Sequence, residues 1–403
     1  MSNCQILRET IWWQIYPLGA VGAPIRDRSD DDSAHRLQEL IPWLAYAKDL
    51  GCSGILLGPI FESAAHGYDT LDYFKLDSRL GDDDDWQVFV SEAKNLGLKF
   101  CLDGVFNHVS VYNHLVDDAL KQGHGLVKLN GEYPEHWEGN LDLATLDHAN
   151  PQVAELIEQV MTHWLEKGAD AWRLDAAYSV PADFWAKVIP SVKQRFPEAA
   201  FIGEVIHGDY VQFVEQTHID TVTQYELWKA IWSSLKDTNM WELAHALDRH
   251  NDFGQAMIPQ TFIGNHDVTR IASQVGEELA KVAVALLFTL PGCPSVYYGD
   301  EVGYLGDKGS ELSADDALRP ALPQSIEVLD DQRDMYEVYK RCITLRRQNP
   351  WLSTAEVSVL DKQNEWIEYR VTSGDNELKA RIEIADKPSV QVSINGSAQQ
   401  LVA

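Results

Sequence analysis

Short apolar segments recur eight times along the chain, and amphipathic stretches lie between most of them. A run of four or five apolar residues is typical of a buried strand, whereas apolar residues three and four positions apart indicate a helix. After the first segment, for example, Leu37, Leu40 and Leu44 fall on one helical face. Strands that alternate with helices predict a parallel sheet with buried strands. The eight expected strands are Trp12–Tyr16, Gly54–Leu57, Lys99–Asp103, Ala171–Asp175, Ala200–Glu204, Thr221–Tyr225, Gln260–Gly264 and Ser295–Tyr298.

The positions of polar residues distinguish the two sheets that this alternation allows, an open doubly wound sheet and a closed barrel. In a closed barrel the carboxyl ends of the strands converge on one rim, where active sites are built. In an open sheet the same residues would lie in a row. Four candidates for chemistry lie at or just after the ends of different strands: His108, Asp175, Glu204 and Asp267. We therefore predict a (β/α)8 TIM barrel.

Two stretches depart from the repeat and predict additions to the barrel. Residues 109–148 form a stretch that is too long for a connecting loop and has little apolar periodicity, which indicates a short inserted lid subdomain over the barrel mouth, after the third strand. Residues 353–403 alternate polar and apolar side chains and contain the hairpin signal Asn395-Gly396, so we expect a small C-terminal antiparallel β domain. The barrel would then comprise residues 1–108 and 149–352.

Residues that precede helical stretches predict where helices begin. Asn150 is a favourable N-cap, and Pro151 suits the first position of a helix. The acidic run Asp82–Asp85 also precedes a helical pattern. We expect this run to cap a helix and to complement its dipole rather than to bind a metal.

The composition excludes several classes of partner. The formal net charge is −29 at pH 7, and so negative a surface repels nucleic acid and anionic membranes. No apolar stretch reaches the length of a membrane span. The five cysteines have no C-x-x-C spacing, which argues against a disulfide framework and a zinc cluster. Because residues 1–10 have no signal-peptide pattern, we expect a cytoplasmic protein; its oligomeric state stays open.

Three separated segments end in a carboxylate where a barrel strand is expected to stop. These acids are Asp175, Glu204 and Asp267, and Arg173 and His266 stand near the first and the third. Cleavage of a glycosidic bond requires one carboxylate that attacks and one carboxylic acid that protonates the leaving oxygen. A third anion can stabilise the cationic transition state. One such acid alone would be typical of a helix N-cap, but three in this order favour glycosidase chemistry.

The ordered motifs resemble those of the alpha-amylase superfamily, glycoside hydrolase family 13. Any one motif is weak, whereas the set in the family's order is highly specific. The motifs are Gly67–Tyr73, Asp103–His108, Arg173–Ala177, Gly203–Val205, Asn265–Asp267 and Tyr297–Glu301. The resemblance extends from about residue 11 to residue 350.

The resemblance implies three catalytic roles. Asp175 would be the nucleophile that forms a covalent glycosyl-enzyme. Arg173, two residues earlier on the same side of a strand, would keep Asp175 ionised. Glu204 would act as general acid and then as general base, so it must hold a proton near neutral pH. Asp267 would stabilise the transition state.

The resemblance also implies a set of substrate-binding residues, to which Arg173 belongs. Tyr68 would stack on a sugar ring. His108 and His266 would donate hydrogen bonds to hydroxyl groups of the sugar. Asp69 and Arg319 would pair at the closed end of the sugar cleft.

Departures from the family's pattern bear on cofactors. Asn107 stands where many relatives have a calcium ligand, but the segment Leu141–Asp147 matches only in part the one that supplies an acidic ligand. After Asp175, Tyr178-Ser179 replaces the Lys-His that amylases of the family often show. We therefore expect no metal and no cofactor; calcium is the alternative.

Together these patterns predict a retaining alpha-glycoside hydrolase that acts on α-glucosidic bonds of malto-oligosaccharides through a covalent intermediate. The short additions to the barrel favour soluble oligosaccharides over granular starch. Two alternatives stay open. The first is an α-glucan transglycosylase that passes the same intermediate to a sugar acceptor, and the second is a non-catalytic amylase-like protein that binds carbohydrate. Linkage, chain length and endo or exo action are not fixed by the sequence.

Overall fold

The computed structural model describes residues 4–26, 28, 34–309, 315–326 and 333–403. Its central feature is an eight-stranded parallel sheet in the order β12-β11-β10-β5-β2-β1-β14-β13. The end strands of this sheet meet through a parallel bridge between Thr223 and Gln260, which closes it into a barrel. The strands are β1 (Trp12–Ile15), β2 (Gly54–Leu57), β5 (Lys99–Gly104), β10 (Ala171–Leu174), β11 (Ala200–Gly203), β12 (Thr221–Val222), β13 (Gln260–Thr261) and β14 (Cys293–Tyr297). The predicted barrel is confirmed, and each expected strand is present.

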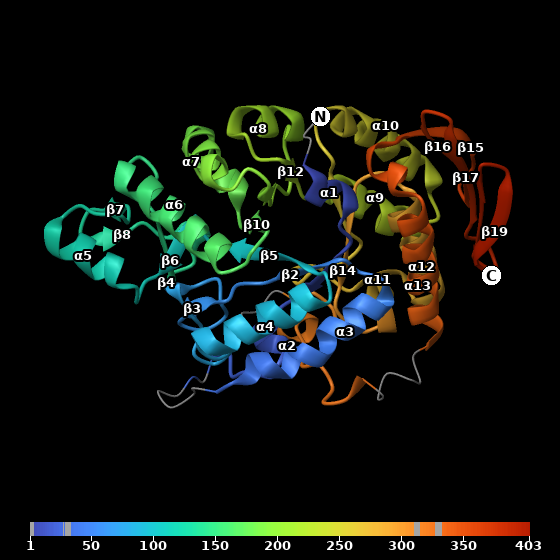
Figure 1. Ribbon diagram of the computed structural model, residues 1–403. Helices are drawn as coiled ribbons and strands as arrows, with labels where there is room; N and C mark the ends of the chain where they lie inside the picture. Colours follow the sequence, from blue (N-terminus) through green and yellow to red (C-terminus); the bar gives the residue numbers. More distant parts are fainter. Residues whose placement is uncertain (1–3, 27, 29–33, 310–314, 327–332) are drawn as a thin grey trace.

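Helices surround the barrel (Figure 1). They are α1 (Gln5–Glu9), α2 (Pro17–Ala20), α3 (Ile41–Leu50), α4 (Asp83–Asn95), α6 (Pro151–Glu166), α7 (Ala182–Arg195), α8 (Tyr210–Thr217), α9 (Tyr225–Lys236), α10 (Met240–Ala256), α11 (Ile271–Val275), α12 (Glu277–Thr289) and α13 (Arg333–Gln348). The side chain of Asn150 accepts a hydrogen bond from the Gln152 N–H and caps α6, as predicted. The buried face of α6 includes Val153, Ile157 and Trp164.

Apolar side chains fill the barrel near the start of its strands. A cluster of buried residues there joins six strands, and Trp12, Leu56 and Ile202 belong to it. Gly54 leaves room for Trp12, because a Cβ atom at Gly54 would lie 2.5 Å from the Trp12 ring. This packed interior makes the barrel a rigid support for residues at the opposite ends of the strands.

The stretch 109–148 forms a small excursion beside the barrel. It contains α5 (His114–Gln122), the ribbon of β7 (Leu129–Asn130) and β8 (Tyr133–Pro134), and β9 (Leu143–Thr145), which pairs with β6 (His108–Ser110). A hairpin of β3 (Phe61–Ser63) and β4 (Thr70–Leu76) precedes it. Figure 1 shows the excursion at the left edge of the molecule.

An antiparallel sheet of five strands follows the barrel, as predicted. Its strands are β15 (Glu356–Lys362), β16 (Trp366–Ser373), β17 (Asn376–Glu383), β18 (Ser389–Ile394) and β19 (Ser397–Val402). Asn395 and Gly396 have φ angles of 47° and 87° and form the expected hairpin turn between β18 and β19. This sheet packs against α10, α12 and α13 (Figure 1). The boundaries between the domains stay predictions.

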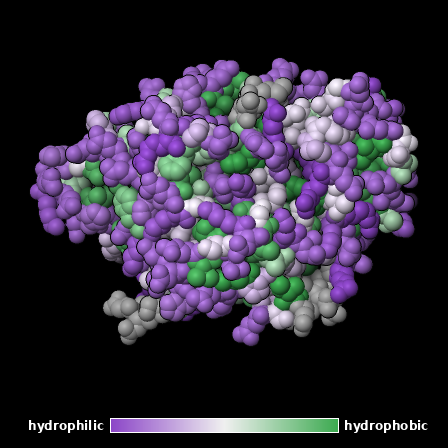
Figure 2. Space-filling view, viewed as in Figure 1, coloured by the Kyte–Doolittle hydropathy of each residue, from purple (hydrophilic) through white to green (hydrophobic). Residues whose placement is uncertain are grey.

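The surface has the character that the charge indicates. Figure 2 shows a face on which hydrophilic residues predominate and apolar residues are scattered. None of the helices in the described part of the chain combines the length and the apolar composition that a membrane crossing needs.

Candidate active site

A pocket of about 540 Å³ opens at the carboxyl ends of the barrel strands. The three acids singled out by the sequence all line it. Asp175 follows β10, Glu204 follows β11, and Asp267 lies beyond β13. The barrel therefore brings together three carboxylates that are far apart in the sequence.

Arg173 on β10 is a buried cation shared by several carboxylates. Its side chain is 4% exposed. Nη1 lies 2.6 and 2.7 Å from the two oxygens of Asp103, whereas Asp175 Oδ1 is 3.4 Å away. Nη2 lies 2.7 Å from Glu204 Oε1. One arginine thus faces three acids, and its shortest contacts are with Asp103 and Glu204.

The distribution of hydrogen-bond donors differs from the predicted one. Glu204 accepts hydrogen bonds from Arg173, from the Ala176 N–H at 3.0 Å and from the Tyr225 hydroxyl at 3.2 Å. Burial and the neighbouring Glu204 raise the pKa of Asp175 well above its usual range, and Arg173 opposes this only in part. Arg173 thus contacts Glu204 more closely than Asp175, whereas the spacing along β10 predicted Asp175 as its main partner. The catalytic roles of the two acids stay predictions.

Asp267 has a different environment. His266 Nε2 lies 2.9 Å from its Oδ2, and Arg319 Nη2 lies 2.8 Å from its Oδ1. Burial alone would raise the pKa of Asp267, but His266, Arg319 and Arg173 outweigh it and lower the pKa. Asp267 is therefore an anion at neutral pH, as a group that stabilises a cationic sugar must be.

Tyr68 presents a fixed aromatic ring to the pocket. It stacks on His266 with ring centroids 5.4 Å apart and an interplanar angle of 3°. Its hydroxyl donates to Asp103 Oδ2 at 3.0 Å and contacts His266 Nε2. Gln14 Nε2 lies 3.2 Å from His266 Nδ1, so this amide holds the imidazole from the other side. The ring of Tyr68 is thus held by His266 and Asp103 in the wall of the pocket.

His108 lines the pocket as a neutral imidazole. Burial lowers its pKa to about 3. Its Nε2 lies 3.0 Å from the carbonyl oxygen of Tyr68, and its ring stacks on Trp137 at 4.5 Å. Because Nε2 already has a partner, His108 holds Tyr68 and Trp137 in position.

The expected pair of Asp69 and Arg319 does not form. Asp69 is 3% exposed and accepts hydrogen bonds from the N–H groups of His66 and Gly67. Arg319 instead contacts Asp267 and, at 3.3 Å, Asp315. Asp69 therefore stabilises the loop that carries Tyr68, while Arg319 lines the pocket itself.

Several pocket residues were not anticipated from the sequence. Tyr225 follows β12, so its position at a strand end was an available signal. Trp137 and Glu138 come from the inserted stretch, where no spacing pattern identifies them. Tyr178 donates to Glu138 Oε1 at 3.3 Å, and Trp137 donates to Ser179 Oγ at 3.4 Å. The two residues that replace the family's Lys-His thus contact the inserted stretch.

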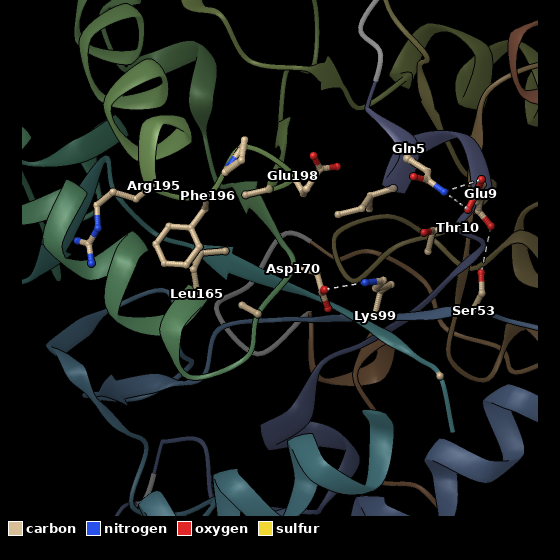
Figure 3. A pocket seen from close by; sticks show the side chains of 15 residues that line it. Gln5, Glu9, Thr10, Ser53, Lys99, Leu165, Asp170, Arg195, Phe196 and Glu198 are labelled. Atoms are coloured by element: carbon tan, nitrogen blue, oxygen red, sulfur yellow. Dashed lines mark hydrogen bonds and ion pairs between the residues drawn. The ribbon is translucent and has the colours of Figure 1, made fainter. Parts of the chain in front are cut away.

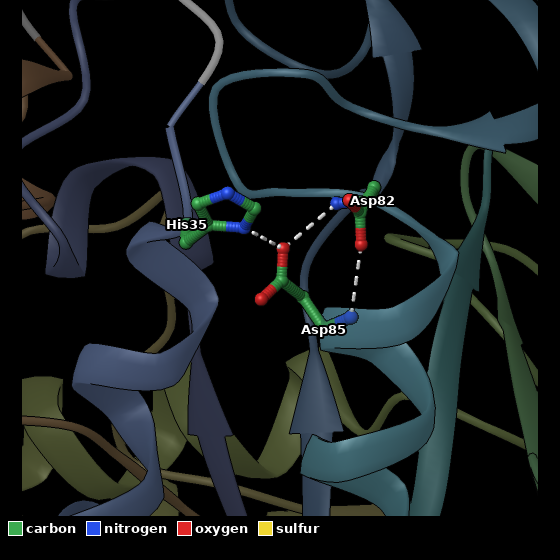
Figure 4. A group of neighbouring side chains, drawn as sticks. All are labelled: His35, Asp82 and Asp85. Carbon is green, nitrogen blue, oxygen red and sulfur yellow. Dashed lines mark hydrogen bonds and ion pairs between the residues drawn. The ribbon is translucent and has the colours of Figure 1, made fainter.

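One group of His, Asp and Glu side chains among the described residues is close enough to hold a metal, and it lies at the start of α4 (Figure 4). Asp82 accepts hydrogen bonds from the N–H groups of Asp84 and Asp85, and Asp85 accepts one from the N–H of Asp82. His35 Nδ1 lies 2.6 Å from Asp85 Oδ2. These contacts form a capping box, which confirms the predicted cap.

A second cavity of about 570 Å³ lies at the other end of the barrel. It is lined by Thr10, Ser53, Lys99 and Asp170, which stand at or just before the starts of strands (Figure 3). Lys99 and Asp170 form an ion pair of 3.0 Å across it. No predicted site residue lines this cavity. In barrels of this kind the amino ends of the strands serve stability.

The family model for the alpha-amylase catalytic domain matches residues 26–130 and 130–327. The chain belongs to the alpha-amylase family. This membership confirms the predicted family and identifies the chain as a glycosidase. It also agrees with the order of motifs along the chain and with the convergence of three acids on one pocket.

Several proteins of this family are similar over most of the chain. A cyclomaltodextrinase from Geobacillus thermopakistaniensis is 29% identical over 92% of this chain and 68% of its own length. An intracellular maltogenic amylase from Bacillus subtilis is 27% identical over 91% of this chain and 67% of its own length. The chain thus spans about two thirds of these relatives.

Solved structures show the same fold. The debranching enzyme of Nostoc punctiforme has a TM-score of 0.80 and 27% identity, and the match covers 93% of this chain and 87% of that one. A cyclic alpha-maltosyl-(1→6)-maltose hydrolase from Arthrobacter globiformis has a TM-score of 0.84 and 23% identity, and the match covers 95% of this chain and 92% of that one. At that identity the likeness concerns the fold alone.

Proposed function

We propose that this alpha-amylase family member is a retaining α-glycoside hydrolase that cleaves α-glucosidic bonds of soluble malto-oligosaccharides. The observation that carries the proposal is the convergence of Asp175, Glu204 and Asp267 on one pocket above Arg173. The names of the related cyclomaltodextrinase and maltogenic amylase support an α-glucan as the substrate.

Cleavage takes two steps. In the first, Asp175 attacks the anomeric carbon, the bond to the leaving oxygen breaks, and Glu204 transfers its proton to that oxygen. The anion of Asp267 stabilises the positive charge that develops on the sugar. In the second step Glu204 removes a proton from water, the water oxygen bonds to the anomeric carbon, and Asp175 is released. Two inversions give net retention.

The surroundings of the two acids must change before the first step. In the free protein the donors gather on Glu204, and Asp175 has the raised pKa. A bound sugar changes this balance, because its glycosidic oxygen accepts a hydrogen bond from the protonated form of Glu204. The productive complex is then the one in which Asp175 is ionised and Glu204 carries the proton.

The remaining pocket residues bind the sugar. Tyr68 supplies the stacking surface, and His266 and Arg319 flank Asp267 where hydroxyl groups of the sugar would lie. Arg173 holds the carboxylates of Asp175 and Glu204, and His108 holds Tyr68 and Trp137. Asp69 stabilises the loop that carries Tyr68. The proposal includes no metal and no cofactor, and it places the enzyme in the cytoplasm with an oligosaccharide as partner.

Incubation with maltose, maltotriose, isomaltose, panose, sucrose and trehalose, and identification of every product, tests which sugars the enzyme cleaves. We expect glucose and maltose from maltotriose, with the α anomer formed first by NMR. A β anomer as the first product would contradict retention. Oligomers longer than maltotriose would favour the transglycosylase, since water and sugar compete for the same intermediate.

Treatment with a chelator tests whether the activity needs a metal. Dialysis against a chelator should change kcat/KM on the accepted substrate by less than about twofold, because the three acids need no metal for this chemistry. Activity that is lost on chelation and restored by calcium would overturn this part of the proposal.

A further inference from the structure

Tyr225 has a hydroxyl group that lies within the active pocket. The residue is 7% exposed and begins α9, directly after β12. Its hydroxyl donates to Glu204 Oε1 at 3.2 Å and accepts a hydrogen bond from Asn265 Nδ2 at 3.0 Å. Asn265 Oδ1 in turn accepts from the N–H of Asp267 at 2.9 Å. A chain of three hydrogen bonds therefore runs from the backbone of one acid to the carboxylate of another.

The direction of this chain is fixed by the amide of Asn265. Its oxygen is occupied by the N–H of Asp267, so its NH2 group faces Tyr225. An amide NH2 group can only donate. The hydroxyl of Tyr225 accepts this hydrogen bond with a lone pair, and its own proton points to Glu204.

The ring of Tyr225 is held between other aromatic rings. Phe262 and Trp228 lie 4.9 and 5.7 Å away between centroids, both edge-on. Gln224 caps α9 by accepting from the N–H of Leu227 at 3.3 Å, which fixes the first turn of the helix. The hydroxyl therefore cannot turn away from Glu204 without repacking.

We propose that Tyr225 is a positioning residue that stabilises the carboxylate of Glu204 as it gives up its proton, an inference that rests on the proposed function. The other two donors to Glu204 are Arg173, which is shared with two more acids, and the backbone of Ala176. Tyr225 is a neutral side chain among these donors. It assists the step in which the proton of Glu204 moves to the leaving oxygen, while the bond between that oxygen and the anomeric carbon breaks and Asp175 bonds to the carbon.

The test compares two substrates that differ in their need for a proton. Maltotriose has a sugar leaving group that must be protonated, whereas α-glucosyl fluoride loses fluoride without a proton from the acid. We expect Tyr225→Phe to lower kcat/KM for maltotriose by about tenfold, the effect of one hydrogen bond to a charged group. For α-glucosyl fluoride the change should stay below about twofold, because kcat/KM reports only the first step.

Tyr369→Phe is the matched control. Tyr369 is fully buried, and its hydroxyl lies 2.5 Å from that of Thr289, far from the pocket in the C-terminal sheet. Its removal should leave the ratio of the two kcat/KM values unchanged. An equal fall on both substrates for Tyr225→Phe, or no fall on either, would overturn the role of Tyr225.

A second substitution keeps the test decisive if the phenylalanine variant does not fold. Tyr225→3-fluorotyrosine retains the hydroxyl and the packing but makes the hydroxyl a stronger donor. We expect it to raise the ratio of kcat/KM for maltotriose to that for the fluoride, and an unchanged ratio would contradict the proposal. A wild-type protein that turns over neither substrate would instead overturn the proposed function.

Discussion

Arg173 and Arg270 are both buried near the carboxyl ends of barrel strands, but the acids that contact Arg173 include two that line the open pocket, whereas the acid that contacts Arg270 does not line it. Arg173 contacts the carboxylates of Asp103, Asp175 and Glu204. Arg270, between β13 and α11, contacts a single carboxylate, that of Asp300, at 2.8 Å. Its other hydrogen bonds go to the carbonyl oxygens of Tyr298 and Leu318.

The difference lies in the balance of charge and in access. Around Arg173 the acids outnumber the cation, and burial together with this excess of negative charge raises the pKa of Asp175. Around Arg270 one acid balances one cation, and the rings of Tyr297, Tyr298 and Tyr304 lie 4.4 to 5.8 Å from the guanidinium carbon. The same residue types thus make a reactive cluster in one place and a sealed structural one in the other.

Neutralising either acid of the reactive cluster should have the largest effect. We expect Asp175→Asn and Glu204→Gln each to lower kcat about a thousandfold, because an amide neither attacks the sugar nor supplies the proton. The urea midpoint should not fall, since each change leaves one carboxyl group fewer around the single buried cation of Arg173. Steady-state kinetics on maltotriose and urea unfolding measure both effects. A variant that keeps more than a tenth of the wild-type rate would refute its assignment.

The sealed cluster should respond in stability rather than in chemistry. Asp300→Asn leaves Arg270 as a buried cation without its counterion, so we expect a loss of about 3 kcal/mol in the free energy of unfolding. Asp49→Asn is the control, because Asp49 is 67% exposed where it pairs with Lys340 and should cost less than about 1 kcal/mol. Urea unfolding measures both variants. Equal losses would show that the carbonyl partners alone satisfy Arg270.

The neighbouring Glu301 makes the sealed region sensitive to pH. Burial and Asp300 raise the pKa of Glu301 to about 7. The folded protein therefore holds a proton that the unfolded chain releases near its ordinary pKa of 4.5, so this stability is full below about pH 4.5 and is lost as the pH rises through 7. Between pH 5 and pH 8 we expect the wild type to lose about 2 kcal/mol relative to Glu301→Gln. Urea unfolding of both proteins at the two pH values measures this, and parallel behaviour would contradict it.

The contrast between the two clusters also shows which parts of the fold and the site can be predicted from the sequence. The alternation of apolar segments predicted every strand of the barrel, because each buried strand is a short run of apolar residues, such as Gly54–Leu57. The three acids were found because each closes such a run. The closest partners of Arg173 were not predicted, since spacing along one strand suggested that Arg173 serves Asp175, two residues away. Its partner across the sheet, Asp103 on β5, is closer.

Contacts that involve long connections were also beyond the sequence. The pairing of Arg319 with Asp267 depends on the path of the chain after β14, where no periodic pattern fixes the position of a side chain. For the same reason the contact of Trp137 with Ser179 could not be anticipated from the inserted stretch. Local spacing predicts elements and the residues at their ends, whereas contacts between loops require the folded chain.

The acidic group at the start of α4 extends the comparison, because we expect its loss to have the smallest effect on stability. Asp82 caps α4 through hydrogen bonds of 2.9 and 3.1 Å to the N–H groups of Asp84 and Asp85. We expect Asp82→Ala to cost about 1 kcal/mol in unfolding free energy, as the loss of an N-cap usually does. Adding calcium should leave the thermal midpoints of wild type and variant unshifted, because Asp82 Oδ1 accepts from two backbone N–H groups and Asp85 Oδ2 contacts His35 and the N–H of Asp82. A calcium-dependent rise in the wild type that is absent from the variant would show instead that these acids bind metal, and that charge is balanced here by an ion rather than by the helix.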